Sequence, residues 1–202
     1  MFALVDKSDN SITRMLSGNQ GITLNDLQYP RAIYTLWTEA ERNAIGIYVI
    51  EIDDTNKKDT EWYINTNITY AFDGTNATGS YGTATARSHA DTLYTAQDET
   101  DGLGTEGDVR VEGLKTILIR TLKHNVANEL ANTDWYITRN AEKSTAIPSA
   151  ITTHRDLVRS RQATMETQIT NASNTPALET LYTHTTDSDG VQSRPLGIIP
   201  TL

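Results

Sequence analysis

Cysteine is absent from the 202 residues of this sequence, and so is any long apolar run. Without cysteine, neither a disulfide framework nor a thiolate metal site is possible. No stretch approaches the roughly 18 consecutive apolar residues of a membrane-spanning helix. The apolar start, 1–5, is ended by Asp6 and Lys7, so it is shorter than the core of about 7–15 residues in a secretion signal. We therefore expect synthesis in the cytoplasm and no membrane partner.

Large apolar residues are scarce, and the charge balance is acidic. Leu, Ile, Val and Phe together number 42 of 202 residues, close to the content at which a hydrophobic core becomes marginal. The formal net charge of -9 disfavours binding to nucleic acids or anionic membranes. Threonine is the most frequent residue, with 32 copies, and its branched polar side chain suits half-solvated strands. A chain of this length allows one domain or two small ones.

What the first part of the chain does contain is a series of short strand patterns. "MFALV" and "SITRML" flank the turn-rich "DKSDN", which predicts a β-hairpin. "GITL", "AIYTLW" and "GIYVIEI" are further predicted strands, and we expect "EWYINTNITYAF" to be the hairpin partner of the last. We assign 1–72 as a small β-rich docking domain.

One helix is expected within this domain. Thr38 is followed three residues later by Glu41, which predicts a capping box in which each side chain bonds the other residue's amide. The helix should run from Glu39 to about Ile45, with Gly46 at the C′ position.

Residues 73–108 change in character. Six of the twelve glycines lie between Gly74 and Gly107, among small polar and acidic residues. Such a composition buries too little apolar surface to order itself alone. We therefore predict an extended Gly/Thr-rich linker or arm, with a short helix within 86–97.

Residues 109–182 carry helical patterns. A four-residue repeat drifts by only about 40° per step, so its members line one broad face of a helix that ends at Asn132 or Thr133. A second helix should begin near Pro148. "NASNT" ends it, Pro176 opens a short third helix, and 183–202 is an extended tail with an apolar end. The first face comprises Leu114, Leu118, Leu122, Val126 and Leu130.

The second helix has a seven-residue repeat, Ile151, Val158, Met165 and Ala172. The companion positions of such a seam are His154, Arg161 and Gln168, which are all polar, so a long coiled coil is not expected. The pattern favours a short helical bundle, formed within one chain or between chains.

The stretch "NTDWYITRNAEKSTAIP", 132–148, joins these two helices. We interpret it as a turn in which Trp135 and Tyr136 cover the open end of a helical hairpin and Asp134 binds local amides. A buried tryptophan removes on the order of 200 Å² from water, a contribution that a small hairpin needs.

Three short stretches resemble catalytic or ligand-binding motifs, but each lacks the neighbouring residues or elements that the motif requires. "GLGTEG" at 102–107 matches a dinucleotide fingerprint but follows an acidic segment instead of a buried strand, so a flexible loop is expected. "HRD" at 154–156 lacks the Asn of a kinase loop and is interpreted as solvated helix residues, although His154 lies near the apolar face. "DSDG" at 187–190 lacks the remaining ligands of a calcium loop and predicts a polar turn.

The four histidines lie about thirty residues or more apart along the chain, unlike the close pairs of zinc sites. They are His89, His124, His154 and His184. We assign no catalytic, cofactor-binding or metal-binding residue.

Two blocks of the sequence follow a recognisable order. The first comprises "MFALV" and "QYPRAIYTLWTEAERNAIGIYVIEID", and the second is "LANTDWYITRNAEKSTAIPSAITTHRDLVRSRQ". In the second, a helix, an Asp-Trp pair, an Arg, a Pro and an Arg-containing helix follow one another. These blocks resemble small tail-fibre and tail-assembly proteins of tailed bacteriophages. The resemblance implies a virion tail component or a factor that helps to build one, and it carries no catalytic residues; 73–108 lies outside the pattern.

Three functions follow as hypotheses for an α+β protein of this kind. The first is a structural subunit of a phage tail (fibre, fibre-adaptor or baseplate-peripheral), made in the host cytoplasm and located in the virion. It would dock to other tail, baseplate or fibre proteins and form a homo-oligomer, with a trimer favoured, because two segments of about 70 residues bury too little alone. The second is a tail-fibre assembly chaperone that is not retained in the virion. The third is an enzyme acting on surface glycans through paired acids.

The packing or interface residues are taken to be Trp37, Tyr48, Leu114, Leu118, Leu122, Val126, Leu130, Trp135, Ile151, Val158 and Met165.

Overall fold

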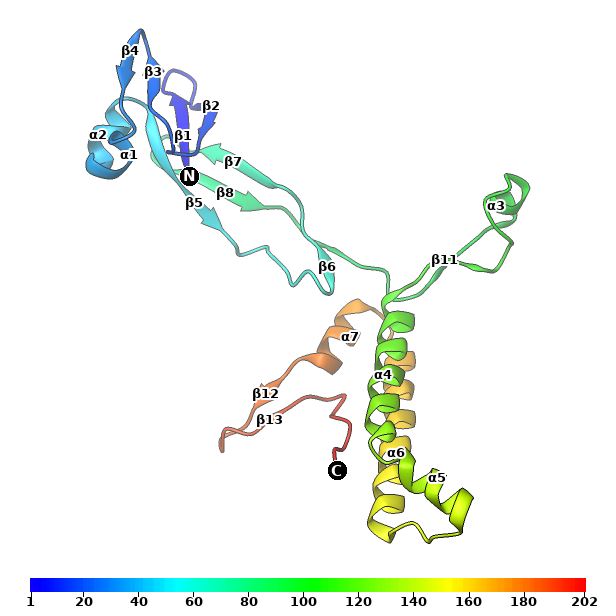
Figure 1. The fold of residues 1–202 in the computed structure, drawn as a ribbon. Coiled ribbons are helices and arrows are strands. Elements are labelled where there is room, and N and C mark those ends of the chain that lie inside the picture. Colours follow the sequence, from blue (N-terminus) through cyan, green and yellow to red (C-terminus); the bar gives the residue numbers. More distant parts are fainter. The chain divides into compact units, whose positions relative to one another are not determined.

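In the computed structural model, which describes residues 1–202, the chain forms two compact units, Met1–Thr85 and Ala86–Leu202 (Figure 1). The class is α+β, as predicted, with a nearly closed β-sheet in the first unit and helices in the second. No helix combines the length and the apolar composition that crossing a membrane requires.

The first unit is built on a five-stranded sheet with strand order β2-β1-β5-β8-β7. The predicted hairpin of β1 and β2 is confirmed, and so is the strand β5. β5 pairs in parallel with β8, and the other neighbours are antiparallel. The strands are β1 (Phe2–Asp6), β2 (Ser11–Leu16), β5 (Ile47–Asp53), β7 (Ile68–Phe72) and β8 (Ala77–Tyr81).

The prediction that the strand in "EWYINTNITYAF" pairs with β5 is wrong, because β7 pairs with β8. Asp73 explains the choice: its Oδ1 accepts the amides of Thr75 and Asn76 at 2.8 and 2.7 Å, which closes a tight turn between β7 and β8. Side chains of Asp favour such turns by bonding amides two residues on. β8 also contradicts the prediction of one extended segment over 73–108.

Two apolar clusters lie on opposite faces of this sheet, because successive strand residues alternate between faces. Ala3 and Val5 of β1 belong to one cluster, while Phe2 and Leu4 pack against the other. The first cluster is Ala3, Val5, Tyr48, Ile50 and Ala77. The second is Leu16, Ile22, Ile33, Tyr34 and Ile47.

The second cluster is covered by a small hairpin and two short helices. β3 (Ile22–Leu24) and β4 (Leu27–Tyr29) are joined by Asn25 and Asp26, both with positive φ, as a two-residue hairpin turn requires. The prediction of a strand at "AIYTLW" is wrong, because α1 (Ile33–Leu36) starts after Pro30 and buries Ile33 and Tyr34.

The helix predicted from its capping box is confirmed as α2 (Glu39–Ala44). The amide of Thr38 donates to Glu41 at 2.7 Å, and Thr38 Oγ1 accepts the amide of Glu41 at 3.3 Å. Gly46 follows with φ +80°. The first unit ends with two-residue strands, β6 (Tyr63–Ile64) and β9 (Thr85–Ala86), the latter at the boundary.

The second unit begins with an arm, residues 91–113. It contains β10 (Thr92–Leu93), α3 (Ala96–Thr100) and β11 (Val109–Val111), and β10 pairs with β11. The short helix predicted within 86–97 therefore lies further along the chain, because Thr95 and Asp98 form a second capping box there.

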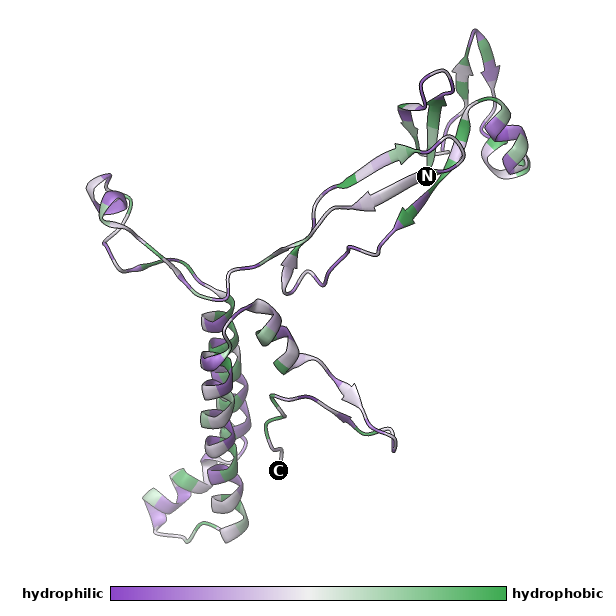
Figure 2. Ribbon diagram, turned by 180° about the vertical axis from the view of Figure 1, so that it is seen from behind, coloured by the Kyte–Doolittle hydropathy of each residue, from purple (hydrophilic) through white to green (hydrophobic).

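Helices form the rest of the second unit, as predicted. α4 (Leu114–Ala131) ends at Asn132 and α7 (Thr175–Tyr182) carries Pro176 in its first turn. α6 (Ser149–Asn171) packs antiparallel to α4, and Figure 2 shows apolar and polar residues alternating along this pair of helices. α5 (Asp134–Lys143) lies between them in the chain. The tail contains β12 (Thr185–Thr186) and β13 (Gln192–Ser193).

Candidate interaction surfaces

The predicted apolar faces of α4 and α6 lie within one hairpin. Four residues of α4 are buried, namely Leu114, Leu118, Leu122 and Val126, while Leu130 is half-buried. On α6 the predicted row is buried as well, namely Ile151, Val158 and Met165. These seven residues therefore form a core inside the chain and are not available as a seam between chains.

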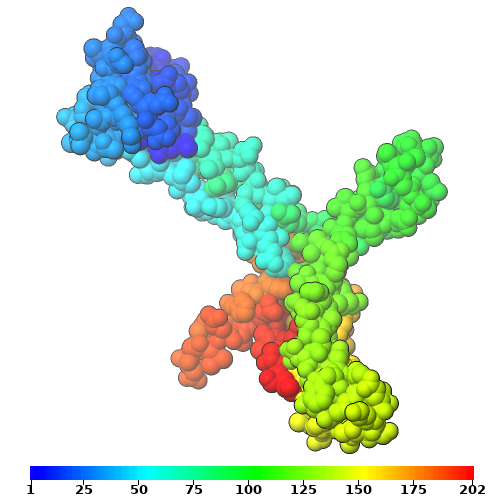
Figure 3. Space-filling model, viewed as in Figure 1, coloured from blue at the N-terminus to red at the C-terminus, as the bar shows by residue number.

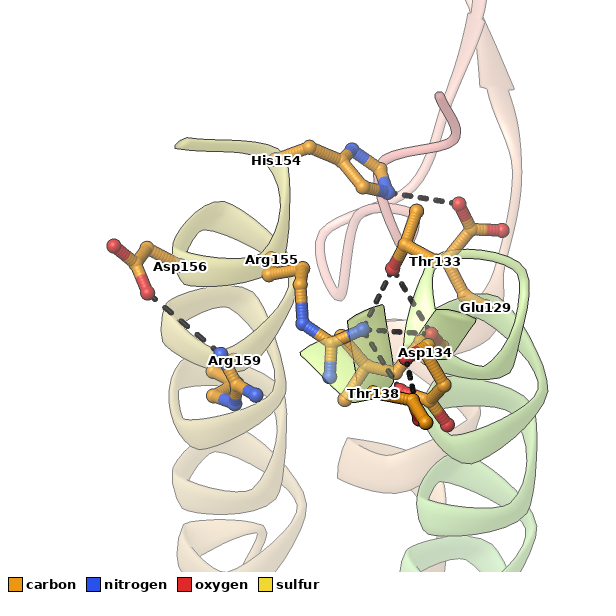
Figure 4. Close-up of polar contacts among 9 residues, drawn as sticks. Glu129, Thr133, Asp134, Thr138, His154, Arg155, Asp156 and Arg159 are labelled. Carbon is orange, nitrogen blue, oxygen red and sulfur yellow. Dashed lines mark hydrogen bonds and ion pairs between the residues drawn. The ribbon is translucent and has the colours of Figure 1, made fainter. Parts of the chain in front are cut away.

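The closed end of this hairpin is held by Arg155, whose side chain is only 9% exposed. Figure 4 shows its guanidinium directed at the end of α4. Nη1 lies 2.8 Å from the carbonyl oxygen of Leu130, 2.6 Å from Thr133 Oγ1 and 2.9 Å from Asp134 Oδ1. Three oxygens around one nitrogen fix the start of α5 relative to α6. Charge-assisted bonds of this kind are about twice as strong as neutral ones.

His154 makes a second polar link across the hairpin. Its Nε2 lies 2.9 Å from Glu129 Oε1, and both side chains are largely buried. The interpretation of "HRD" as solvated residues is wrong for His154 and Arg155 and correct for the exposed Asp156. The position of His154 near the apolar face, which favours a hydrogen-bonded structural role, is confirmed by its bond to Glu129. A buried arginine on a helix has no sequence signature of its own, because its partners are a distant carbonyl and hydroxyl.

The prediction that Trp135 covers the end of the hairpin is wrong. The segment is the helix α5, no residue of α5 is buried, and Trp135 is 53% exposed. Thr133 occupies the interior position instead, with 0% exposure. The indole stacks on Tyr136 at 4.1 Å between centroids, and the Arg139 guanidinium lies 4.6 Å from the indole centroid. Trp135 is therefore a surface residue, and its role as a contact to another molecule stays a prediction.

In the first unit, Trp37 and Tyr48 both pack against rings. Trp37 is half-buried and meets Tyr29 edge to face at 5.8 Å, and Tyr48 is buried beside Phe72 at 4.4 Å. The geometry assigns packing roles to both.

Two of the three polar seam positions of α6 bind the C-terminal tail. Arg161 Nη2 donates to the carbonyl of Leu196 at 3.0 Å, and Gln168 Nε2 donates to that of Pro195 at 3.3 Å. Leu196 itself is buried. This contact was not predicted, although two polar residues seven apart at seam positions of an amphipathic helix were its signal.

The arm is fixed to the start of α4 by Asp91. Its Oδ1 accepts the amide of Gly113 at 2.6 Å, and its Oδ2 accepts the hydroxyl of Thr116 at 2.8 Å. These two donors lower the pKa of Asp91 below its ordinary value, the Gly113 amide most strongly. The carboxylate thus satisfies the amide of the N-cap residue Gly113, while the carbonyl oxygens of Ser88 and His89 accept the amides of Leu114 and Lys115.

Two of the short sequence motifs, "GLGTEG" and "DSDG", lie in loops. "GLGTEG" lies in the arm, where Tyr94 covers Gly104 so closely that a Cβ there would meet the ring. "DSDG" forms the predicted polar turn, in which Asp187 Oδ1 accepts the amides of Asp189 and Val191. No cluster of three or more His, Asp and Glu side chains is placed to hold a metal ion.

The first unit also has a shallow hollow. It lies beside the end of β1 and is lined mainly by aliphatic side chains and backbone, with Lys7 as its single charged residue. Lys7 Nζ donates to the carbonyl of Ala44 at 3.3 Å. The more prominent features of the chain are therefore its packed hairpin, its arm and its exposed apolar side chains. In comparisons with known proteins, no family model, no curated protein and no solved structure matches the chain.

Proposed function

We propose that the chain is a structural component of a bacteriophage tail, as a fibre, fibre-adaptor or baseplate-peripheral subunit that docks to other virion proteins and self-associates. The phage assignment rests on the resemblance of 1–5, 28–53 and 130–162. The last block contains both ends of the contact between Asp134 and Arg155. The order Asp-Trp, Arg, Pro and Arg-containing helix in this block therefore has a structural role, since it places Asp134 and Arg155 where they close the helical hairpin.

The observation that carries the self-association is the amount of accessible surface. The chain exposes 12992 Å². A compact monomer of 22.4 kDa is expected to expose about 9,400 Å², and two separate compact units of these sizes about 11,400 Å². The excess over the second figure is about 1,600 Å², twice what each partner contributes to a standard interface of about 800 Å² per side.

Exposed apolar side chains account for part of this surface. Eighteen large hydrophobic residues are exposed, among them Leu36 at 79% and Ile198 at 70%. Single exposed hydrophobic residues are ordinary. An excess of accessible surface together with many exposed hydrophobic residues is typical of a subunit whose surface is covered by neighbouring subunits in an assembly.

The first test is the mass of the full chain in solution by light scattering. A homo-oligomer is expected, and a trimer of 22.4 kDa chains would weigh about 67 kDa. A monomer over the whole accessible concentration range would overturn the self-association.

The second test is mass spectrometry of purified phage particles from the source of the gene. Stoichiometric presence is the expected result for a tail subunit. An oligomer that is missing from the particles would instead identify an assembly factor that leaves, and the assignment to the virion would be wrong.

A further inference from the structure

The arm, residues 91–113, has an apolar surface that nothing in its own unit covers. Every Leu and Val in it is about half exposed, between 47% and 59%. Residues 92–111 hydrogen-bond only with one another, and Figures 1 and 3 show the arm as a separate branch with α3 at its end. The four side chains are Leu93, Leu103, Val109 and Val111.

The arm is nevertheless organised as a built element. Asp91 fixes its base to α4, Arg110 bonds Asp98 at 3.0 Å, and Tyr94 lies over Gly104. An isolated two-stranded hairpin is at best marginally stable in water. A defined element with its apolar residues outside therefore points to a second surface that covers it.

Charge identifies which surface fits. The arm contains seven acidic residues and one basic residue, a net charge of -6. The helical hairpin that follows, 114–171, contains eight basic and five acidic residues, a net charge of +3, within a chain of net charge -9. Arg155 is buried beside Asp134 and Arg120 pairs with Glu112 of the same chain, so the exposed bases Lys123 and Arg159 are among those offered to a second arm. The hairpin also exposes Ile117 and Leu157. Opposite charges steer and orient two such surfaces.

We propose that the arm of one copy of this chain packs against the outer side of the helical hairpin of a second copy. The contact joins two different surfaces, so it is head-to-tail and closes into a ring when the rotation between copies allows. The proposal rests on the self-association proposed above, and it adds the surfaces and their polarity. The surface excess of about 1,600 Å² is enough for two contacts per copy, one made by its own arm and one made by its hairpin with the arm of a neighbour.

The first experiment compares the solution mass of the full chain with that of the variant Leu103→Ser/Val111→Ser. Val191→Ser is the matched control, because Val191 and Val111 are both 59% exposed and Val191 lies outside the arm. The arm variant should raise the dissociation constant of the oligomer at least about tenfold, which corresponds to about 1.4 kcal/mol. The control should keep the wild-type mass, and far-ultraviolet circular dichroism checks that both variants are folded.

The second experiment reverses charges and does not depend on apolar substitutions. Glu106→Lys/Asp108→Lys changes exposed acids of the arm, and Lys123→Glu/Arg159→Glu changes exposed bases of the hairpin. Each double variant alone should dissociate at least about tenfold more readily, and the variant that carries all four substitutions in one chain should associate again, because every arm then meets a hairpin of opposite charge in a ring of any size. Restored association requires the arm of one copy to meet the hairpin of another.

The outcomes separate this proposal from the proposed function. A wild-type oligomer whose mass is unchanged by both arm variants would overturn the arm contact and leave self-association intact. A wild-type monomer would overturn both. If each double variant dissociates but the variant that carries all four substitutions fails to associate, the partner of the arm lies elsewhere and the pairing with the hairpin is wrong.

Discussion

Arg155 and Arg159 lie one turn apart on α6 but in opposite environments. Arg155 is buried against Leu130, Thr133 and Asp134, whereas the side chain of Arg159 is 52% exposed and pairs with Asp156 at 3.7 Å. We expect Arg155→Met to lower the free energy of unfolding of the second unit by about 2–3 kcal/mol, since the Leu130 carbonyl, the Thr133 hydroxyl and the Asp134 carboxylate each lose a charged donor. Chemical denaturation followed by circular dichroism measures the change.

Arg159→Met is the matched control for this substitution. It removes the same charge from the same helix, but exposed ion pairs contribute little, so the change should stay within about 0.5 kcal/mol. Equal effects of the two substitutions would show that Arg155 does not hold the hairpin.

Gly46 combines two requirements at one residue. Its φ is +80°, and a Cβ would lie 2.8 Å from the carbonyl oxygen of Val5. Gly74 has φ +98° but only an ordinary contact, at 3.7 Å from Asn10. Gly74→Ala should therefore cost about 1 kcal/mol for the left-handed backbone alone, and Gly46→Ala at least about 2 kcal/mol. Thermal unfolding of the two variants measures the difference, and equal melting temperatures would contradict the role of the Val5 contact.

Trp135 shows what a sequence pattern leaves open at the residue scale. A tryptophan between two amphipathic helices suggests burial, but only the path of the chain decides it. Because the ring is 53% exposed, Trp135→Ala should change the free energy of unfolding by no more than about 1 kcal/mol, most of it from the lost contact with Arg139. Leu122→Ala, in the core of the same unit, should cost about 3 kcal/mol in the same denaturation experiment. A loss of similar size for Trp135 would show that the indole is buried in solution.

At the scale of elements, sequence patterns correctly predicted the helices and faces that depend on residues close together in the chain. The faces of α4 and α6, the capping box of α2 and the start of α7 each follow from residues a few positions apart, and all were correct. The pairing of β5 with β8 and the tail contact of Arg161 link residues far apart in sequence. "AIYTLW" is a short apolar run, for which helix and strand have nearly the same pattern. Such features depend on tertiary contacts that no local window contains.

Asp91 couples the arm to α4, and its titration gives this coupling a pH dependence. Its pKa is lowered in the folded protein because the Gly113 amide and the Thr116 hydroxyl donate to it. A lowered pKa means that the stabilisation is complete above the unfolded value of about 3.9 and is lost as the pH falls through the folded value. Asp91→Asn should therefore increase amide hydrogen exchange at 113–117 at neutral pH.

The difference between Asp91→Asn and the wild type should shrink as the pH is lowered below the folded pKa of Asp91, because both side chains are then uncharged. Exchange followed by mass spectrometry at several pH values, corrected for intrinsic rates, measures this convergence. A difference that stays constant down to strongly acidic pH would show that the carboxylate charge does not fix the arm.

At the scale of the whole molecule, each of the two units has a hydrophobic core of its own. We therefore expect two unfolding transitions in calorimetry. Gly46→Ala should lower only the transition of the first unit, and Arg155→Met only that of the second. A single transition that both substitutions lower would mean that the units unfold as one.

Protein concentration should act on only one of these transitions. The arm and the helical hairpin both belong to Ala86–Leu202, so an oligomer held through them stabilises that unit by mass action. A tenfold rise in concentration is worth up to about 1.4 kcal/mol, or roughly 4–8 °C in the melting temperature of a unit of this size. The transition that Arg155→Met lowers should therefore rise with concentration, while the transition that Gly46→Ala lowers stays fixed. If the concentration-dependent transition belongs to the first unit instead, copies meet through the β-sheet unit and the arm contact is wrong.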